Sequence, residues 1–179
     1  MTTTVSAPIG SITGTEASTL AGQYLTFGLG AEEYGVAIGK VQEIIAAVAV
    51  TAVPAMPAFA LGVINLRGKV VPVIDLRQKL GMRSTDVTPE SCIVITRTAN
   101  LGVGLLVDRV SEVLTVQSAN IEPPPATGSG LIARVLLGIA KTGASVKLLL
   151  NLDGVVEDSE ANAIHSAIVE HNASDSQAA

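Results

Sequence analysis

The chain carries an internal duplication, and this feature restricts its fold more than any other. Residues 35–45 (GVAIGKVQEII) align without a gap with residues 104–114 (GLLVDRVSEVL). Farther along, Asp75-Leu76 aligns with Asn151-Leu152 at a slightly larger offset. The larger offset indicates an insertion, which we place in the loop-forming stretch 122–130 (EPPPATGSG). A duplicated chain of 179 residues predicts two similar small units that pack together.

Short runs of β-forming residues dominate both halves of the chain. Leu25, Phe27 and Leu29 alternate with their neighbours, which is the period of two expected for a half-buried strand. The predicted strands are Tyr24–Leu29, Tyr34–Ile38, Val70–Asp75, Cys92–Arg97, Val103–Val107, Leu131–Ala140 and Val146–Leu150. Short helical pieces are predicted at Lys40–Ile45, Leu76–Leu80 and Arg109–Leu114. Many short strands with frequent turns favour small barrels, so we expect an all-β fold with short helices, built as two packed barrels.

The two ends of the chain are more polar than its body. Residues 1–22 contain no Lys or Arg and no continuous apolar run, so we predict a disordered tail and not a secretory signal. Residues 157–179 are predicted to form a helix, capped by Asp158 and ending near Glu170, and then a disordered end from residue 172. Its apolar face would consist of Ala161, Ile164, Ala167 and Ile168. The duplicated body then spans residues 23–156, with the boundary between its halves near residues 82–91.

Composition and charge argue against a nucleic-acid partner. The chain has a net charge of −5, two Tyr, two Phe and no Trp. Nucleic-acid binders need a basic surface and aromatic rings on which bases can stack. The single cysteine, Cys92, lies in an apolar run and is predicted to be a small buried side chain. One cysteine permits no internal disulfide, which fits a reducing compartment, and we expect a cytoplasmic protein.

Residues 44–64 contain no charge and are long enough to cross a bilayer. Pro54 and Pro57 interrupt this segment, and proline in a helix interior costs about 3 kcal/mol. We therefore interpret the segment as part of the core with an internal loop, and we expect no membrane insertion.

The chain lacks the residue patterns of common enzymes. It contains no nucleophile elbow, Walker loop, dinucleotide fingerprint or HExxH sequence. Asp75 and Asp108 follow apolar strands, but no partner base can be named for either. His165 and His171 are six residues apart, which does not place them on one helix face as metal ligands. We therefore expect no catalysis, metal or cofactor, and predict a protein that binds other proteins.

The most distinctive segment is residues 62–76, GVINLRGKVVPVIDL. Two apolar runs flank the polar stretch 65–69, in which Asn and Gly predict a hairpin-like turn with positive φ angles. The matching stretch of the second half, residues 141–144, lacks the arginine. Arg67 is therefore either a partner-facing charge specific to the first half or an ordinary exposed turn residue, worth about 0–1 kcal/mol.

Residues 62–76, together with 23–27 (QYLTF), 41–44 (VQEI), 53–54 (VP) and 104–108 (GLLVD), closely resemble the CheW family of chemotaxis adaptors. The resemblance covers about residues 23–156. It implies two intertwined, SH3-like, five-stranded β-barrels related by a pseudo-twofold. It also implies a non-catalytic scaffold that couples the cytoplasmic tip of methyl-accepting chemoreceptors to the regulatory domain of the CheA histidine kinase.

The resemblance also implies a set of partner-binding residues. Glu43 and Arg67 match family positions important for coupling, and their opposite charges predict an ion pair. If that pair were partly buried, loss of one partner would cost about 3–5 kcal/mol. Gly62 and Gly68 suit a close backbone approach or a positive φ. A groove between the barrels for the receptor tip would include Val41, Ile44, Leu106, Val107 and Val110, although each of these also fits an ordinary core position.

Two other functions remain open from the sequence. The chain could serve another chemosensory pathway, such as pilus-driven motility, which a pull-down of its partners would distinguish. A small-barrel nucleic-acid binder is the third interpretation, and a gel-shift at low salt would test it.

Overall fold

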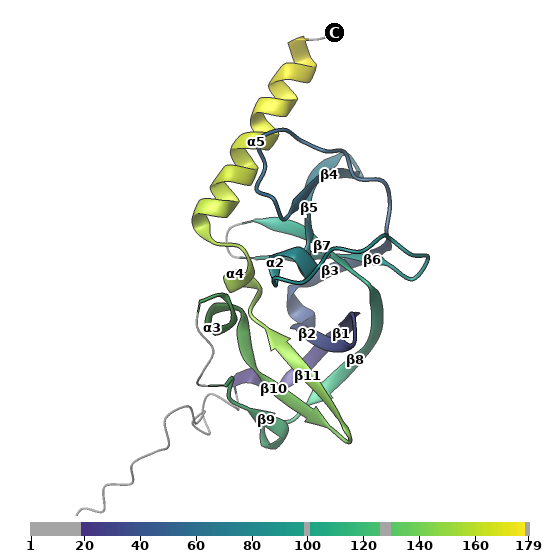
Figure 1. Ribbon diagram of the computed structural model, residues 1–179, viewed down its shortest axis with the longest axis vertical. Helices are drawn as coiled ribbons and strands as arrows, with labels where there is room; N and C mark the ends of the chain where they lie inside the picture. The colour runs from purple at the N-terminus through teal and green to yellow at the C-terminus, as the bar shows by residue number, and fades with distance from the viewer. Residues whose placement is uncertain (1–18, 99–100, 126–129, 178–179) are drawn as a thin grey trace, which may run out of the picture.

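The computed structural model describes residues 19–98, 101–125 and 130–177, and it contains two β-sheets and a long C-terminal helix (Figure 1). Sheet A has six strands in the order β8-β1-β2-β11-β10-β9, and sheet B has five in the order β3-β6-β7-β5-β4. The strands of sheet A are β1 (Gly22–Leu29), β2 (Glu32–Ala37), β8 (Arg109–Val116), β9 (Ile121–Glu122), β10 (Leu136–Thr142) and β11 (Ser145–Leu150). Those of sheet B are β3 (Val41–Ala46), β4 (Ala60–Leu66), β5 (Lys69–Asp75), β6 (Cys92–Arg97) and β7 (Gly102–Val107).

Short helices connect the strands, and the last of them leads from β11 to the C-terminal helix. They are η1 (Ile38–Lys40), α2 (Leu76–Lys79), η2 (Ser118–Asn120), α3 (Leu131–Val135) and α4 (Leu152–Val155). The side chain of Asp75 caps α2 by accepting a hydrogen bond from the Arg77 backbone N–H, and Asn151 caps α4 in the same way through Asp153. These two caps are the aligned Asp75 and Asn151 of the duplication, so the repeat extends from sequence to local structure.

The sequence halves exchange strands. The β1–β2 hairpin of the first half pairs with β8 and, in parallel, with β11 of the second half. The β6–β7 hairpin of the second half pairs in the same manner with β3 and, in parallel, with β5. Each sheet therefore contains strands from both repeats, and neither half of the chain can complete a sheet alone. Two sheets that share strands between the halves in this way are compatible with the expected pair of small barrels.

One apolar core lies between the two sheets. It contains Phe27 and Leu29 of sheet A and Ile74 and Leu105 of sheet B, all fully buried. Two smaller clusters fill the sheets individually, one around Leu149 in sheet A and one built from four residues of sheet B (Ile64, Val73, Ile93 and Ile95). Because the central core draws on both sheets, burial of its apolar side chains stabilises their mutual orientation.

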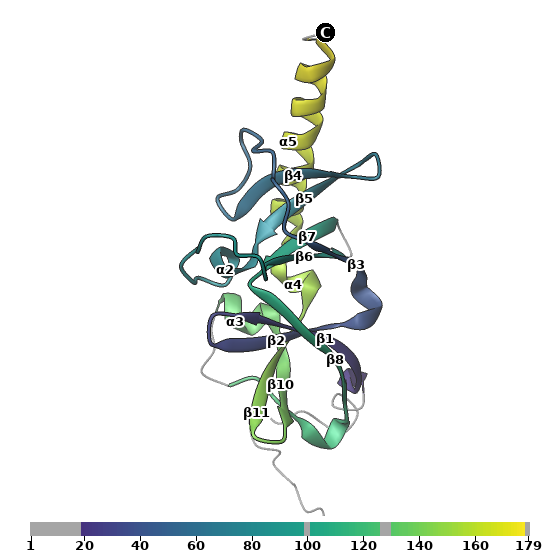
Figure 2. The same ribbon diagram turned by 90° about the vertical axis from the view of Figure 1, so that its right-hand side faces the viewer.

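The C-terminal helix α5 (Asp158–Gln177) packs along sheet B and extends beyond it (Figure 2). Its buried face is the predicted one: Ala161 and Ile164 join the central core, and Ala167 and Ile168 pack against Val53 and its neighbours. The helix begins with a hydrogen bond from the Glu157 backbone N–H to the Glu160 carboxylate (2.9 Å), which is half of a capping box. The cap position is therefore Glu157 and not Asp158.

Three element predictions were wrong. Residues 40–45 and 109–114, expected as helical, lie in strands β3 and β8, apart from Lys40 in η1. Alternating burial along β3 and pairing with β6 outweigh the helical spacing of its apolar residues. Residues 131–140, expected as one strand, form α3 and then β10.

The predicted tails are shorter than expected in the part of the chain that the structure describes. β1 begins at Gly22, and Leu20 packs against the cluster that contains Tyr24. At the other end, α5 continues to Gln177, past Glu170. The remainder of the two predicted disordered tails, residues 1–18 and 178–179, lies outside the described residues.

Candidate partner-binding site

The β4–β5 turn places an arginine where the backbone favours glycine. Leu66 pairs with Lys69, so Arg67 and Gly68 are the two central turn residues, with φ of 52° and 83°. Two successive positive φ angles indicate a type I′ turn, for which Asn-Gly is the preferred pair. The Asn65 side chain supports the turn by accepting a hydrogen bond from the Gly68 N–H (2.8 Å). In the aligned β10–β11 turn, the first central residue is Gly143, with φ of 61°.

The predicted ion pair between Glu43 and Arg67 is confirmed. The Arg67 guanidinium donates two hydrogen bonds to the Glu43 carboxylate, from β4–β5 to β3, at 2.8 and 2.5 Å. The Arg67 side chain is 75% exposed and that of Glu43 is 26% exposed. The cost of 3–5 kcal/mol expected for a buried pair therefore does not apply, and an exposed pair contributes about 0–1 kcal/mol to folding.

The pair has no equivalent in the second repeat. Glu112 aligns with Glu43, lies on β8 and is exposed. Within the described ranges, the ion pairs of the chain do not include Glu112. The asymmetry expected between the two halves is thus present in the structure, and it matches the absence of an arginine from the β10–β11 turn.

Gly62 fulfils the predicted close backbone approach. Its φ is 144°, and a Cβ at this position would collide with the carbonyl oxygen of Thr51. Thr51 and Val63 exchange backbone hydrogen bonds of 2.9 and 2.8 Å, which fix the β3–β4 loop against β4. Gly62 therefore acts through the backbone, by holding this loop next to the Arg67 hairpin.

The five apolar residues predicted to line one groove do not lie together. Val41 and Val110 are partly buried against the central core, at the starts of β3 and β8. Ile44 is exposed beside Glu43 on β3. Leu106 was expected between the two barrels, but it packs against the apolar cluster of sheet B. Val107 is fully buried in the central core, so its side chain is not available to a partner.

Leu106 nevertheless borders a surface groove of about 420 Å³ on sheet B. The groove lies between the β3–β4 loop and Val87, and Val48 and Val87 are exposed there. Its remaining lining is equally apolar: Ala47, Ala49, Val50, Leu61 and Ile93. Exposed apolar side chains around a groove are typical of a protein-binding surface.

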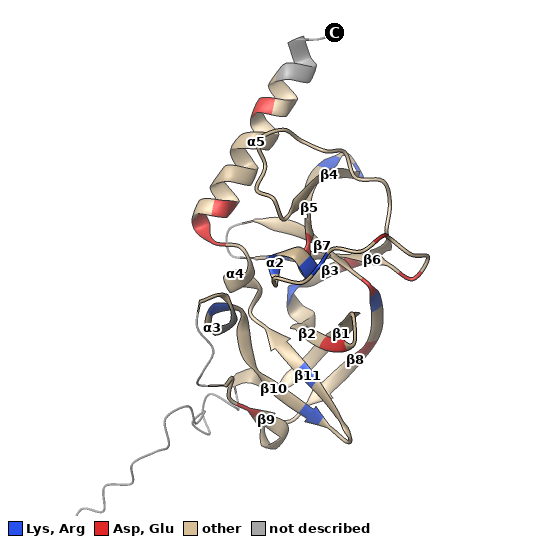
Figure 3. Cartoon of the chain, viewed as in Figure 1, with Lys and Arg blue, Asp and Glu red and all other residues tan. Residues whose placement is uncertain are grey.

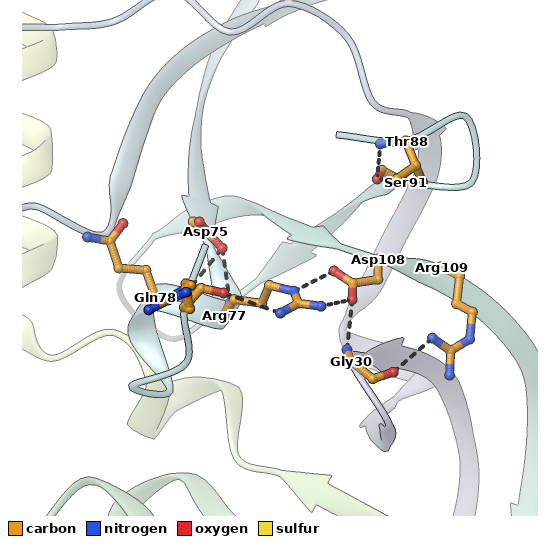
Figure 4. Close-up of polar contacts among 9 residues, drawn as sticks. Gly30, Asp75, Arg77, Gln78, Thr88, Ser91, Asp108 and Arg109 are labelled. Atoms are coloured by element: carbon orange, nitrogen blue, oxygen red, sulfur yellow. Dashed lines mark hydrogen bonds and ion pairs between the residues drawn. The ribbon is translucent and has the colours of Figure 1, made fainter. Parts of the chain in front are cut away.

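A second polar cluster was missed by the sequence analysis. Arg77 Nε donates a hydrogen bond to Asp108 Oδ1 (2.7 Å), and its Nη2 donates to Asp108 Oδ2 (Figure 4). Asp108 Oδ2 also accepts a hydrogen bond from the Gly30 backbone N–H at 2.7 Å. The hydrogen bond from Arg77 is the main cause that lowers the pKa of Asp108, and the Gly30 bond adds to it. Asp75 lies in the motif 62–76 and Asp108 ends the motif 104–108. The spacing of these residues in the sequence gave no sign that Arg77 would form hydrogen bonds with both carboxylates.

Charged residues occur on both sheets and on the C-terminal helix (Figure 3). No group of three or more potential metal ligands occurs among the described residues. The uncharged segment 44–64 runs through β3, a loop and β4, and the described helices include none that is both long and apolar enough to cross a membrane.

Comparison with known proteins gives consistent matches. The profile of the CheW-like domain family matches residues 23–160. The chain is 38% identical over 141 residues to the probable chemotaxis protein CheW of Rhizobium etli, covering 79% of this chain and 91% of that protein. It is 31% identical over 165 residues to chemotaxis protein CheW of Klebsiella aerogenes, covering 92% and 99%. The crystal structure of scaffolding protein TtCheW from Thermoanaerobacter tengcongensis superposes with a TM-score of 0.72 at 34% identity, covering 79% of this chain and 96% of that one.

These matches define a scaffold protein of bacterial chemotaxis. The chain belongs to the CheW family, as its sequence motifs indicated.

Proposed function

We propose that this chain couples the cytoplasmic tip of methyl-accepting chemoreceptors to the regulatory domain of the CheA kinase, without catalysis of its own. The observation that carries the proposal is Arg67, which is exposed, oriented by Glu43 and held at a positive φ. The proposal assigns the Glu43–Arg67 pair and the apolar groove of sheet B to the kinase. It assigns Val41 and Val110, where the chain passes between the sheets, to the receptor.

Arg67 is poorly explained by folding alone. A side chain at positive φ costs about 1–2 kcal/mol relative to the right-handed region, and glycine avoids this cost. The exposed ion pair with Glu43 offsets at most about 1 kcal/mol. A residue retained against the local backbone preference is typical of a functional position. The Arg67 side chain remains 75% exposed beside Glu43, so its remaining N–H groups can donate to carbonyl or carboxylate oxygens of a partner.

The groove supplies the apolar part of the same surface. Glu43 and Ile44 lie on β3, and the loop that follows β3 forms one wall of the groove. The charged pair and the apolar groove are therefore on connected segments of sheet B. A binding surface of this kind combines an apolar centre with charged residues at its border. Burial of the groove predicts a negative heat-capacity change on binding.

Calorimetric titration of a kinase regulatory domain into the purified chain tests the proposal. Arg67→Ala and Glu43→Ala should each weaken binding, and a double-mutant cycle should show strong non-additivity, because the two side chains act as one unit. Glu112→Ala is the matched control, since it removes the aligned carboxylate that lacks an arginine. Normal binding by Arg67→Ala, or an equal loss in Glu112→Ala, would contradict the proposal. Binding should not change when a chelator is added.

A further inference from the structure

The chain crosses between the two sheets at two points, and one of them is held by a network of charges. The crossovers are η1, between β2 and β3, and Asp108, the single residue between β7 and β8. The Asp108 carboxylate accepts hydrogen bonds from Arg77 in α2, which follows β5 of sheet B. It also accepts one from Gly30, in the β1–β2 turn of sheet A (Figure 4). One carboxylate therefore ties both sheets to the crossover.

Backbone bonds and a second arginine extend the same contact. The Asp108 N–H donates to the Gly28 carbonyl oxygen (3.1 Å). Arg109 Nη1 donates to the Gly30 carbonyl oxygen at 3.2 Å. The Arg109 guanidinium also fills the space beside Gly28 that a Cβ would occupy. We call Arg77, Asp108, Arg109 and the β1–β2 turn the inter-sheet clasp.

The other crossover is held more weakly. Lys40 at the end of η1 forms an ion pair of 3.3 Å with Asp153 in α4, and the two side chains are 45% and 40% exposed. Lys40 aligns with Arg109 in the duplication, and Asp153 with Arg77. In the clasp, by contrast, Arg77 and Asp108 are 15% and 25% exposed and make a bidentate contact. Bidentate pairs shielded from water are stronger than single exposed pairs, so the Asp108 crossover resists a change of sheet orientation more than the Lys40 crossover does.

The crossovers lead directly into the surface that the proposed function assigns to the receptor. Val110 is the second residue after Asp108, and Val41 is the first residue after Lys40. Both side chains pack partly buried against the central core that the two sheets share. Val41 lies on β3 of sheet B and Val110 on β8 of sheet A, so the distance between the two valines depends on the angle between the sheets. Glu43 and Arg67, in contrast, both belong to sheet B, so their pairing does not depend on that angle.

We propose that Arg77 and Asp108 are positioning residues that fix the orientation of sheet A against sheet B, and thereby the receptor-binding arrangement of Val41 and Val110. This inference rests on the proposed function in one respect, the assignment of these valines to the receptor. The orientation of the sheets themselves can be measured without any partner.

The first test compares two affinities in the same variants. Arg77→Ala should weaken binding of a receptor-tip fragment by about tenfold or more, because it leaves the half-buried Asp108 carboxylate without its main partner. Its affinity for the kinase regulatory domain should change by less than about twofold, since that surface lies within sheet B. Lys40→Ala is the matched control at the other crossover and should leave both affinities nearly unchanged. An equal loss of both affinities in Arg77→Ala would overturn the inference.

The second test measures the distance between the sheets directly. Spin labels at Val70→Cys on β5 and Val146→Cys on β11 would report it by pulsed electron resonance, in a Cys92→Ser background, because both valines are exposed. The unmodified clasp should give one narrow distance distribution, and Arg77→Ala should broaden or shift it. Arg77→Lys keeps the charge but not the bidentate contact, and should give an intermediate distribution.

A narrow, unshifted distribution in Arg77→Ala would overturn the inference. Should Arg77→Ala fail to fold, Arg77→Lys supports the same comparison with the unmodified protein. If the unmodified chain binds neither fragment, the proposed function fails, and the distance measurement still decides whether the clasp sets the sheet orientation.

Discussion

Replacing Arg67 by asparagine should stabilise the protein while it damages coupling. Arg67 and Gly68 form a turn with two positive φ angles, and asparagine tolerates this conformation better than arginine. Relief of the backbone cost should contribute about 1 kcal/mol. Loss of an ion pair whose arginine is 75% exposed should remove about 0.5 kcal/mol. The expected net gain of about 0.5 kcal/mol corresponds to a rise in melting temperature of about 1–2 °C.

The assay combines calorimetric melting with receptor-dependent kinase activation on the same preparations. Arg67→Asn should melt slightly higher than the unmodified chain and activate the kinase poorly. Gly143→Arg is the control in the aligned turn, where only the first central residue has a positive φ (61°), and it should cost at least about 1 kcal/mol. If Arg67→Asn lost more than about 1 kcal/mol, the ion pair would be a structural necessity. If it activated the kinase fully, the arginine would not be required for coupling.

Three further changes test the structural basis of the site. Gly62→Ala should destabilise the protein by about 1–3 kcal/mol through backbone strain and the clash with the β3–β4 loop, whereas Gly39→Ala, where a Cβ meets nothing, should be nearly neutral in denaturant titrations. Ile164→Ala should cost about 2–5 kcal/mol because the side chain is fully buried, while Val169→Ala on the exposed face of the same helix should stay within about 0.5 kcal/mol. The hydrogen bond from Arg77 lowers the folded-state pKa of Asp108, so the contribution of the Asp108 carboxylate to the free energy of unfolding is present above the unfolded pKa of about 3.9 and is lost as the pH falls through the folded pKa. Asp108→Asn should therefore flatten the acid side of the stability–pH profile.

The repeat and the family could be predicted because both rest on short continuous motifs. The Glu43–Arg67 pair joins residues 24 positions apart, and its prediction came from the resemblance to the family and from the opposite charges of the two side chains. The turn at Arg67 and Gly68 could be recognised from local conformational preference alone. The buried face of α5 followed from helical spacing, which is also a local property.

The errors share a different cause. The segments 40–45 and 109–114 are strands because their partners β6 and β1 are distant in the sequence, and pairing outweighs the local pattern. The inter-sheet clasp was missed for the same reason: Gly30, Arg77 and Asp108 come together only after the two halves exchange strands. Leu106 and Val107 were assigned to one groove from the family resemblance, but successive strand residues face opposite sides of the sheet.

The most direct test of the proposed function is kinase activity in vesicles that carry methyl-accepting receptors. Autophosphorylation of CheA should be low with receptors and kinase alone, should rise strongly when this chain is added, and should fall again on addition of attractant. Glu112→Ala should support the same activation, and Arg67→Ala should not. Activation that is independent of this chain, or equal activation by Arg67→Ala, would contradict the proposal that the chain couples receptor to kinase through the Arg67 surface.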